Sequence, residues 1–407
     1  MPKLYDLILY GATGFVGQQA IAYLAEHGGT QLRWAIAGRS QDKLASSASA
    51  AGQPDIPMIV ADAQDHVALA RLAAQTRVVL SCAGPYALYG SKLAAACVAH
   101  QTHYCDITGE TPWIRQMIDL HHDTALTQGT RIVPGCGFDS VPSDLGVYLM
   151  QREMLARHGE PCTHIKAAFT LSGGGLNGGT LASMLNMIET DQLSQVQDLF
   201  LLNPEGTRPR DTHPHRDPIG SHRDPDFKGW LGLFFMGPIN TRVVRRSSAL
   251  RGQDLIYQEY MRYGSSALAG AAAATLGIGS KMQSSLMAIS SLRKLTLAAL
   301  PLLPRRFLPQ PGQGPSVENM DRGFFKIELI GTSSTGKKLR GILSDSLDAG
   351  NRATVKMMCE SALALALDEK KLPKAAGVIT PSVALGNVLE QRLLSAQMRV
   401  EISVVSQ

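Results

Sequence analysis

The sequence predicts an α/β protein, with a doubly wound parallel sheet first and a second α+β domain, built on a mixed sheet, after it. Strand-like apolar runs alternate with helix-like segments up to about residue 145, which is typical of a parallel sheet with helices on both faces. After that point the alternation gives way to a Gly-rich turn, a hairpin and isolated helices. A chain of 407 residues suits two domains. We therefore expect a first domain over 1–145, a second over 146–372, and a C-terminal segment, 373–407, that returns to pack on the first.

Short loops join the predicted elements of the first domain. Each predicted strand is a brief apolar run, and a longer helix-like segment follows it. The predicted strands cover 4–10, 32–37, 58–61, 77–81, 103–106 and 131–134, and the helices cover 16–27, 41–51, 65–74, 92–100 and 112–126.

The second domain has fewer regular signals. A strand over 165–172 leads into SGGGLNGGT, a flexible turn, and two strands around SSTG form a hairpin. A polar, Pro-rich loop covers 203–228, and we expect it to be a mobile surface loop or lid. The remaining predicted elements are helices over 180–200, 353–367 and 381–395, an apolar run over 230–238, hairpin strands over 324–332 and 337–343, and a strand over 398–405.

An apolar segment, 267–303, stands apart from the rest of the second domain. Neither of its apolar runs is long enough to span a bilayer, and Lys281, Arg293 and Lys294 interrupt it. Two interpretations stay open. One is a buried helix pair, and the other is an amphipathic surface that touches lipid or forms a dimer.

Composition excludes several classes of function. A net charge of +5 and an aromatic content of 6% fall short of a nucleic-acid-binding surface. The six cysteines form no C-x-x-C pair, so we expect buried thiols in a reducing compartment. The N-terminus shows no export signal, and we expect a cytoplasmic protein. The histidines of the 203–228 loop lie in a Pro-rich setting that does not favour a fixed metal site, so no metal is expected.

Three glycines follow the first predicted strand, in LILYGATGFVG, at spacing G-x-x-G-x-x-G. A strand before them and a helix after them are the context of a dinucleotide-binding turn of the Rossmann type. Gly11 allows the tight turn, Gly14 lets the backbone approach a pyrophosphate, and Gly17 lets helix and sheet pack closely. The N-terminus of the next helix presents N–H groups to the phosphates. The predicted contacts are Gly11, Ala12, Thr13, Gly14, Phe15, Val16 and Gly17.

The end of the second predicted strand indicates which dinucleotide binds. An NAD site would place Asp or Glu there, on the ribose 2′-OH. This chain has AGRS instead, with Arg39 and Ser40, and Lys43 one turn later. A guanidinium beside a hydroxyl suits a 2′-phosphate, because Arg offers forked donors to phosphate oxygens. We therefore expect NADP(H) rather than NAD(H); the alternative is that Arg39 is a solvated surface charge.

Two further loops lie at the ends of predicted strands and extend the cofactor site. Asp62 is expected either to bond the adenine edge or to cap the helix that follows it. In SCAGPYALYG, the residues expected to run close to the nicotinamide ribose are Ser81, Ala83, Gly84 and Pro85.

Polar side chains that could meet a substrate follow the fifth and sixth predicted strands. The segments CDITGE and PGCGFDSVPSDLG contain Asp106, Asp139 and Ser140, which we predict to contact substrate. The alternative for Asp139 and Ser140 is helix capping, since DSVPSD is typical of a helix start. No Tyr-x-x-x-Lys occurs in the chain, which argues against a short-chain dehydrogenase.

The motifs GATGFVG, AGRS, SCAGPYALYG, YCDITGE and GCGFDSVPSD occur in that order. Together they resemble the saccharopine dehydrogenase-like oxidoreductases, and in particular the bacterial branch that includes trans-acting enoyl reductases of lipid biosynthesis. The later segments GPSVENMDRGFFKIELIG and AGVITPSVALGNVLEQRL are similar to that branch too. The resemblance implies a Rossmann domain whose chain leaves into a mixed α+β domain and returns at the C-terminus, use of NADP(H) and hydride transfer. We expect the second domain to bind substrate, and its apolar helices and hairpin suit a homodimer. The resemblance also implies peripheral contact with membranes or lipid.

The chain shows no obvious Arg cluster for a substrate with several carboxylates, and its second domain is apolar. We therefore expect a reductase that transfers hydride to a hydrophobic enoyl or acyl substrate. Two alternatives remain: an NADP(H)-binding sensor or scaffold without turnover, and a dehydrogenase of a saccharopine-like amino-acid conjugate. Candidates for the group that protonates or polarises the substrate are Tyr86, Tyr89, Thr108 and Ser140.

Overall fold

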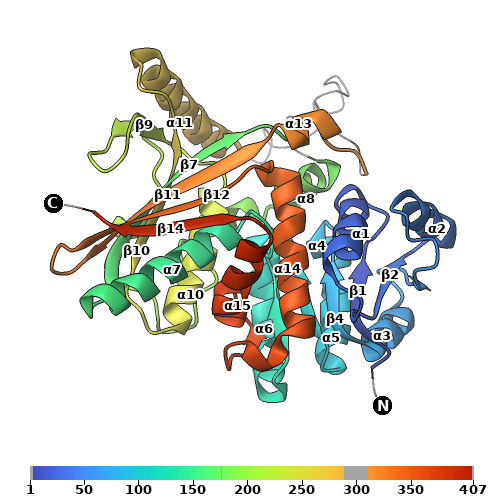
Figure 1. The fold of residues 1–407 in the computed structure, drawn as a ribbon. Helices are drawn as coiled ribbons and strands as arrows, with labels where there is room; N and C mark the ends of the chain where they lie inside the picture. The colour runs from blue at the N-terminus through green and yellow to red at the C-terminus, as the bar shows by residue number, and fades with distance from the viewer. Residues whose placement is uncertain (1–2, 176, 288–309, 311, 406–407) are drawn as a thin grey trace.

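Two seven-stranded sheets lie side by side in the computed structural model, which describes residues 3–175, 177–287, 310 and 312–405 (Figure 1). The first sheet has the order β13-β6-β5-β4-β1-β2-β3, and all its strands are parallel. The second has the order β14-β12-β11-β7-β10-β9-β8 and mixes parallel with antiparallel pairs. The predicted fold class, a doubly wound parallel sheet with a mixed-sheet α+β domain, is confirmed.

The first sheet follows the sequence pattern closely. Its strands are β1 (Tyr5–Tyr10), β2 (Trp34–Gly38), β3 (Met58–Val60), β4 (Thr76–Ser81), β5 (His103–Asp106), β6 (Arg131–Val133) and β13 (Gly377–Val378). Its helices are α1 (Phe15–His27), α2 (Gln41–Ala50), α3 (His66–Gln75), α4 (Tyr86–Tyr89), α5 (Ser91–Ala99), α6 (Thr111–Gln128) and α14 (Thr354–Leu367).

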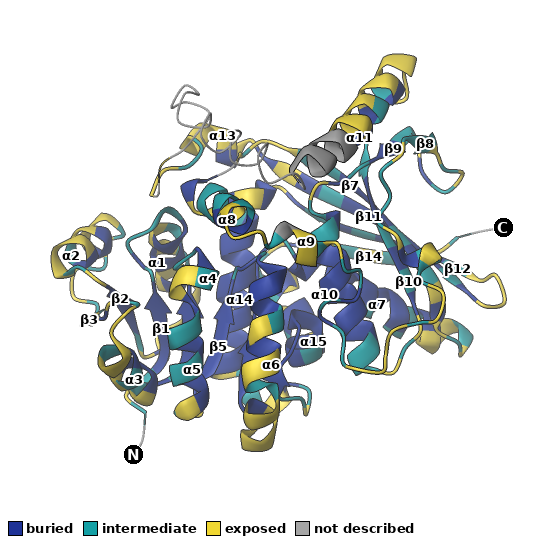
Figure 2. Ribbon diagram, turned by 180° about the vertical axis from the view of Figure 1, so that it is seen from behind, coloured by how far each residue is buried: buried dark blue, intermediate teal, exposed yellow. Residues whose placement is uncertain are grey.

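Helices cover both faces of this sheet, because side chains alternate between the faces along each strand. Leu7 and Leu9 of β1 pack in a core with α1 and α14, while Ile8 and Tyr10 pack in a separate core with α3, α5 and α6. Both cores are almost fully buried (Figure 2). The strands therefore read as near-continuous apolar runs in the sequence.

The second sheet carries its helices mainly on one face, where α7 packs on β7, β11 and β12, and α10 packs on β10. Its strands are β7 (Cys162–Ser172), β8 (His222–Arg223), β9 (Trp230–Gly232), β10 (Ile256–Arg262), β11 (Phe324–Ser333), β12 (Lys338–Asp345) and β14 (Arg399–Val404). The helices are α7 (Val141–His158), α8 (Gly178–Glu189), α9 (Leu193–Val196), α10 (Gly237–Leu250), α11 (Ala267–Met287), α13 (Val317–Asp321) and α15 (Pro381–Ser395), with short turns η1 (His213–His215), η4 (Ala349–Ala353) and η5 (Glu369–Lys371).

The C-terminal part of the chain joins both sheets. Helix α14, which the sequence placed in the second domain, packs across β1, β4 and β5 beside α1. The segment after it divides, since β13 pairs with β6 in the first sheet and β14 pairs with β12 in the second. The prediction that 373–407 returns to the first domain therefore describes β13 but not β14, and the boundaries at 145 and 372 remain a prediction.

Two elements of the second domain differ from the sequence expectation. The helix predicted over 180–200 breaks into α8 and α9, because Asp191 adopts a left-handed backbone conformation with φ of 58°. The apolar run over 230–238 contributes β9 and then the start of α10, which the sequence did not predict.

The apolar segment contributes helix α11, which projects from the body of the molecule (Figure 1). A close approach of Gly270 to Trp230 seats the helix on β9, since a Cβ at 270 would lie 2.4 Å from the indole ring. Leu268, Leu276 and Ile278 stay exposed, so the described part of α11 is not a buried core helix. The rest of the apolar segment, 288–303, lies outside the described residues.

Candidate functional site

The order of the first sheet reverses between β1 and β4, and ligands of doubly wound sheets bind at the carboxyl ends of strands beside such a switch point. The glycine-rich turn follows β1 there, and the turn that begins at Ser81 follows β4. The two turns touch, because a Cβ on Gly11 would lie 2.9 Å from the Ala83 nitrogen. The sheet thus brings the predicted phosphate-binding and nicotinamide-binding turns together.

The three glycines are sterically required where the sequence placed them. Gly11 has φ of +81°, which favours glycine, and a Cβ on Gly17 would lie only 2.3 Å from the Gly11 carbonyl oxygen. Gly14 stands at the N-cap of α1 and offers no side chain to the first N–H groups of the helix. The helix N-terminus is therefore available to a pyrophosphate, and the turn fits the cofactor.

The other residues of the predicted turn contribute backbone or packing. Ala12 and Val16 are buried, and the Thr13 methyl lies 3.8 Å from the Cβ position on Gly38. Phe15 lies against the loop at Gly314, which comes from the other end of the chain.

Arg39, Ser40 and Lys43 gather at the carboxyl end of β2. The Ser40 hydroxyl caps α2 by accepting a hydrogen bond from the Lys43 nitrogen at 3.4 Å. Arg39 and Lys43 are exposed, and within the described part of the chain no carboxylate forms an ion pair with Arg39. A guanidinium without a protein partner, beside a capped helix start, fits a 2′-phosphate; its role remains a prediction.

The capping alternative for Asp62 is wrong. Asp65 caps α3 instead, with its carboxylate accepting from the nitrogens of Val67 and Ala68. Among the residues that the structure describes, Asp62 accepts a hydrogen bond from the nitrogen of Gln64 alone, at 2.8 Å, and it is exposed. Its expected contact with the adenine edge remains a prediction.

Tyr86 organises the turn after β4. Its hydroxyl donates to the Ser81 carbonyl at 3.0 Å and accepts from the Ile107 nitrogen at 3.4 Å. The side chain is buried, and burial raises its pKa well above the ordinary value. Because its proton is donated to a carbonyl, Tyr86 positions this turn in the structure, and its predicted role as proton donor stays a prediction. Tyr89, by contrast, is 38% exposed.

Glu110 supports the turn after β4, although the sequence motifs did not single it out as a site residue. Its carboxylate is 1% exposed and accepts three hydrogen bonds, from the Tyr86 nitrogen at 2.8 Å, the Ala87 nitrogen at 2.9 Å and the Ser183 hydroxyl at 2.7 Å. It therefore joins the turn after β4 to helix α8 of the second domain. A carboxylate directly after a predicted strand was the available signal, but nothing local indicated Ser183 as its partner.

Asp106 and Thr108 also serve the framework. The Asp106 carboxylate is fully buried and accepts from the Thr108 and Gly135 nitrogens, both at 3.0 Å, and from the Tyr104 hydroxyl at 2.8 Å. Burial raises its pKa to about 7. The Thr108 hydroxyl accepts from the Glu110 nitrogen at 3.0 Å. Asp106 therefore ties together the ends of β5 and β6, and its predicted contact with substrate stays a prediction.

Asp139 and Ser140 lie where the sequence placed them, just before α7, but neither side chain caps that helix. The Ser140 hydroxyl is buried without a hydrogen-bond partner among the described residues. The Asp139 carboxylate also lacks a hydrogen bond to any part of the chain that the structure describes, and it is half-buried. Burial raises the pKa of Asp139 to about 6.

The second domain closes this end of the site with apolar side chains. Ile239, in the first turn of α10, lies 3.2 Å from the Cβ position on Gly109, and an Asp139 carboxylate oxygen lies 3.5 Å from the same position. Stacked and edge-on rings lead from Phe138 through Phe169 and Phe234 to an exposed Phe235. Asp139 therefore faces an apolar neighbourhood at the carboxyl edge of the sheet.

Comparison with known proteins identifies the family. Residues 7–133 match the saccharopine dehydrogenase NADP-binding domain family. A Mycobacterium tuberculosis protein, provisionally named a trans-acting enoyl reductase, is 38% identical over 416 residues, which span 98% of each chain. A trans-acting enoyl reductase of Mycobacterium bovis is 36% identical over 423 residues, or 96% of each chain. The chain belongs to the saccharopine dehydrogenase-like oxidoreductases, in the trans-acting enoyl reductase branch.

The fold agrees with this assignment. Saccharopine dehydrogenase (L-Glu forming) from Saccharomyces cerevisiae superposes with a TM-score of 0.56 over 99% of this chain and 100% of its own, at 12% identity. This saccharopine dehydrogenase-like chain is thus an NADP-dependent oxidoreductase, and the expected cofactor, NADP(H), is confirmed at the level of the family.

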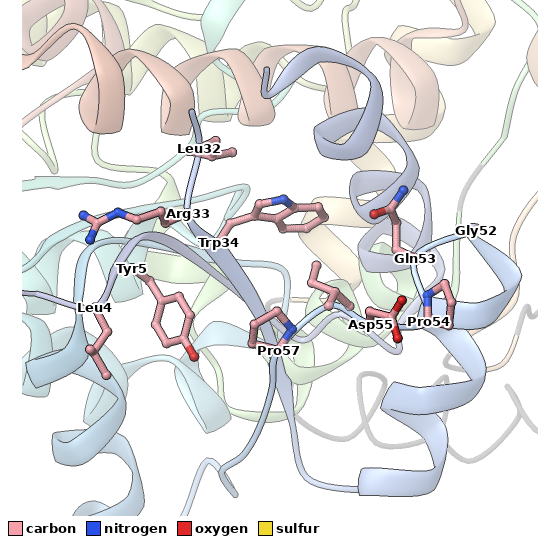
Figure 3. A pocket seen from close by; sticks show the side chains of 11 residues that line it. Leu4, Tyr5, Leu32, Arg33, Trp34, Gly52, Gln53, Pro54, Asp55 and Pro57 are labelled. Atoms are coloured by element: carbon pink, nitrogen blue, oxygen red, sulfur yellow. The ribbon is translucent and has the colours of Figure 1, made fainter. Parts of the chain in front are cut away.

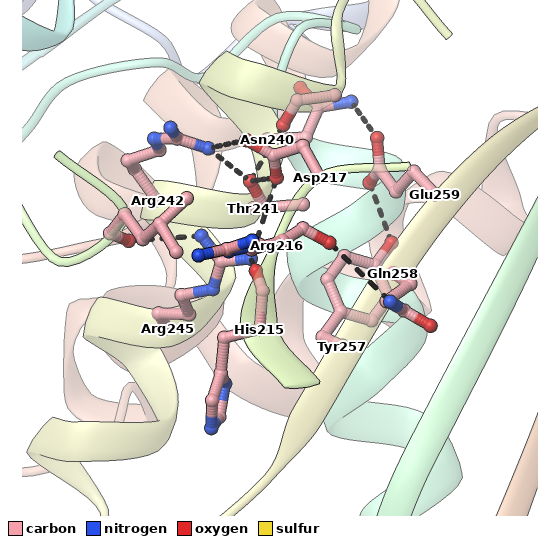
Figure 4. Close-up of polar contacts among 12 residues, drawn as sticks. His215, Arg216, Asp217, Asn240, Thr241, Arg242, Arg245, Tyr257, Gln258 and Glu259 are labelled. Carbon is pink, nitrogen blue, oxygen red and sulfur yellow. Dashed lines mark hydrogen bonds and ion pairs between the residues drawn. The ribbon is translucent and has the colours of Figure 1, made fainter. Parts of the chain in front are cut away.

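The Pro-rich loop of this oxidoreductase is pinned to α10 by buried arginines (Figure 4). Arg242 and Arg245 both pair with Asp217, and their guanidinium groups also donate to the carbonyls of Val196, Leu199 and His215. Arg246 donates to the carbonyls of Leu202 and Val378 at 2.5 and 2.6 Å. These contacts hold the loop at His215 and Asp217, while nearly all of its residues are at least partly exposed; its expected mobility stays a prediction. The same contacts also position α10, and with it Ile239.

A pocket of about 560 Å³ lies away from this site (Figure 3). It is lined by Tyr5, Trp34 and Pro57, which stand at the starts of β1, β2 and β3, so it opens at the amino edge of the sheet. Within the described residues no group of His, Cys, Asp or Glu could hold a metal ion. The helices in the described ranges include none long and apolar enough to cross a membrane.

Proposed function

We propose that this oxidoreductase is an NADPH-dependent reductase of α,β-unsaturated acyl groups on hydrophobic, lipid-like thioesters. The observation that carries the proposal is the apolar wall at the carboxyl edge of the first sheet, where Ile239 closes on Gly109 beside Asp139. Met184, on α8, and Phe235, just before α10, are further apolar side chains of the second domain, and both are exposed. Apolar lining of this kind suits an acyl chain.

The arginines near this wall do not offer a site for a substrate with several carboxylates. Arg242, Arg245 and Arg246 direct their guanidinium groups to Asp217 and to backbone carbonyls. This arrangement argues against a saccharopine-like conjugate as substrate. A relative named as an enoyl reductase over nearly the full length of the chain supports the same conclusion.

NADPH oxidation should be followed with short-chain and long-chain α,β-unsaturated acyl thioesters and with saccharopine. We expect oxidation with the thioesters and a preference for the longer chain. Oxidation with none of them would favour a sensor or scaffold, and reaction with saccharopine alone would favour the amino-acid dehydrogenase.

Cofactor selectivity can be tested separately by fluorescence quenching. Replacing Arg39 with Ala removes a charge-assisted contact of about 1.5–3 kcal/mol, so NADPH affinity should fall about tenfold to a hundredfold. Affinity for NADH should stay unchanged, because NADH lacks the 2′-phosphate. An equal effect on both cofactors would contradict the role of Arg39.

We also propose that α11 brings the protein to an anionic lipid surface. Leu268 is 83% and Ile278 is 66% exposed, and the chain has no Asp or Glu between Glu259 and Glu318. Basic residues lie in that interval, among them Lys281. An apolar face with positive charge nearby suits a headgroup interface; a homodimer through α11 is the alternative outcome of the test below.

A further inference from the structure

We propose that Asp139 donates the proton that completes reduction of the unsaturated acyl group, which makes it a catalytic residue. This inference rests on the reductase function proposed above. The sequence predicted only that Asp139 contacts the substrate. The inference adds that its carboxyl group gives a proton to the α-carbon.

The position of Asp139 provides the first argument. It stands in the turn between β6 and α7, at the carboxyl edge of the first sheet, and its side chain is half-buried. One carboxylate oxygen comes to 3.5 Å from where a Cβ on residue 109 would be, an ordinary van der Waals distance, and Ile239 comes to 3.2 Å from the same position. The carboxylate therefore lies beside Gly109 and Ile239 at this edge.

A continuous set of close approaches joins Asp139 to the cofactor turn. Gly11 approaches Ala83 closely. A Cβ placed on the next residue, Gly84, would lie 3.5 Å from the Ser183 hydroxyl. Ser183 donates to Glu110, which follows Gly109 in the chain. The carboxyl group thus lies on the same edge as the predicted nicotinamide position.

The absence of partners is the second argument. A half-buried carboxylate that accepts no hydrogen bond from the protein is free to contact a ligand. Asp139 has no hydrogen bond or ion pair within the described part of the chain, although it immediately precedes a helix whose N-terminus it could have capped. A carboxyl group kept apart from protein donors and close to apolar side chains is suited to transfer its proton to a ligand.

Nearby carboxylates do not set the protonation of Asp139, which is mostly protonated below pH 6 and only partly protonated at pH 7. Asp106 and Glu110, on the adjoining turn, are engaged in the hydrogen bonds described above. Asp144, in the first turn of α7, accepts from the Ser247 hydroxyl and the Ser382 nitrogen. None of the three contributes to the shift, since burial alone raises the pKa of Asp139 to about 6.

The step balances without a further reactant. Bound NADPH would supply the hydride: its nicotinamide C4–H bond would break to leave NADP+, a C–H bond would form at the β-carbon, and the π electrons would move toward the thioester oxygen to give an enolate. The Asp139 O–H bond then breaks, its proton forms a C–H bond at the α-carbon, and the carbonyl is restored. Asp139 is left as a carboxylate and regains a proton from solvent.

The test compares Asp139→Asn with the wild-type protein in D2O, using NADPH and a long-chain unsaturated acyl thioester. Asp123→Asn, an exposed change on α6, is the matched control, and Tyr89→Phe tests the competing donor. We expect kcat to fall about 10²- to 10⁴-fold in Asp139→Asn, the range typical of a general acid. NADPH binding, measured by fluorescence, should not change.

Two readouts separate a proton donor from a structural role. In the wild type, kcat/KM should decline as pH rises through about 6, because the required acid form is lost, and this decline should disappear in Asp139→Asn. Deuterium should enter one face of the α-carbon in the wild-type product and both faces in the product of Asp139→Asn.

The outcomes are distinguishable from failure of the proposed function. A wild-type protein that reduces the thioester while Asp139→Asn keeps its rate, pH profile and facial selectivity would overturn the role of Asp139 alone. If Tyr89→Phe, and not Asp139→Asn, lost the rate, the pH profile and the facial selectivity, the role of Asp139 would also be overturned. If the wild-type protein oxidises NADPH with none of the unsaturated thioesters, the role of Asp139 and the proposed reductase function are both overturned.

Discussion

Replacing Glu110 with Gln should loosen the contact between the turn after β4 and helix α8. Glu110 is isosteric with Gln, so the change removes a charge and one acceptor without opening a cavity. One oxygen accepts from the Tyr86 nitrogen and the Ser183 hydroxyl, and the other accepts from the Ala87 nitrogen. The amide can keep its oxygen on the side with two donors, but its NH2 group then faces the Ala87 N–H.

The magnitude follows from these three bonds. The unsatisfied N–H pair costs about 1–3 kcal/mol, and the two retained bonds lose the extra strength that a charged acceptor gives them. We expect Glu110→Gln to lower the free energy of unfolding by about 3 kcal/mol. Ser183→Ala removes only the bond to α8 and should cost about 1 kcal/mol.

Urea unfolding of both variants measures these differences. Glu26→Gln, on the exposed face of α1 with a side chain 78% exposed, is the control and should stay within about 0.5 kcal/mol of the wild type. NADPH affinity should also fall in Glu110→Gln, because the turn beside the nicotinamide loses its support. If Glu110→Gln unfolds like Glu26→Gln, the carboxylate does not hold the turn as described.

Four other changes test the remaining features. Asp217→Asn leaves two guanidinium groups without a counter-ion, and urea unfolding should show a loss of about 3 kcal/mol or more, against less than about 0.5 for the exposed Glu205→Gln. Gly17→Ala should abolish NADPH binding in a fluorescence titration, because its Cβ would meet a carbonyl oxygen at 2.3 Å. Because the folded state binds the Asp106 proton more tightly than the unfolded state, protonation of Asp106 stabilises the fold fully below about pH 4, and this stabilisation is lost as pH rises through about 7. In Asp106→Asn, the free energy of unfolding should change less between pH 4 and pH 7. Flotation of the protein with anionic liposomes should weaken in Leu268→Asp. If the wild type does not float but light scattering shows that Leu268→Asp lowers its molar mass, α11 forms a homodimer instead.

The sequence predicted the first sheet well because its signals are local. Except for the edge strand β3, the strands are buried on both faces and read as apolar runs, and Gly17 is required by contact with Gly11 and Ala12 a few residues away. The sequence could not predict in the same way which distant elements pack on or join that sheet. Helix α14 and strand β13 reach it from the far end of the chain, and no local pattern specifies which sheet an apolar helix covers.

The site shows the same division at the level of single residues. Motif positions placed Asp139 and Ser140 correctly, but the capping expectation failed because neither side chain turns back to its helix. Glu110 and Ile239 acquire their roles only when α8 and α10 come to lie against the first sheet. Helix α10 itself was missed because buried arginines gave its segment a polar composition, and their carbonyl partners are set by the tertiary fold.

The division of the C-terminal segment between the sheets has a consequence for synthesis of the protein. The ribosome releases the β1–β6 region first, but the layer that α14 provides over β1, β4 and β5 is made only at residues 354–367. Until then the nascent chain exposes one apolar face of its nucleotide-binding half. A fragment that stops before α14 should therefore be prone to aggregate, and the two halves should reach their native state together rather than one after the other.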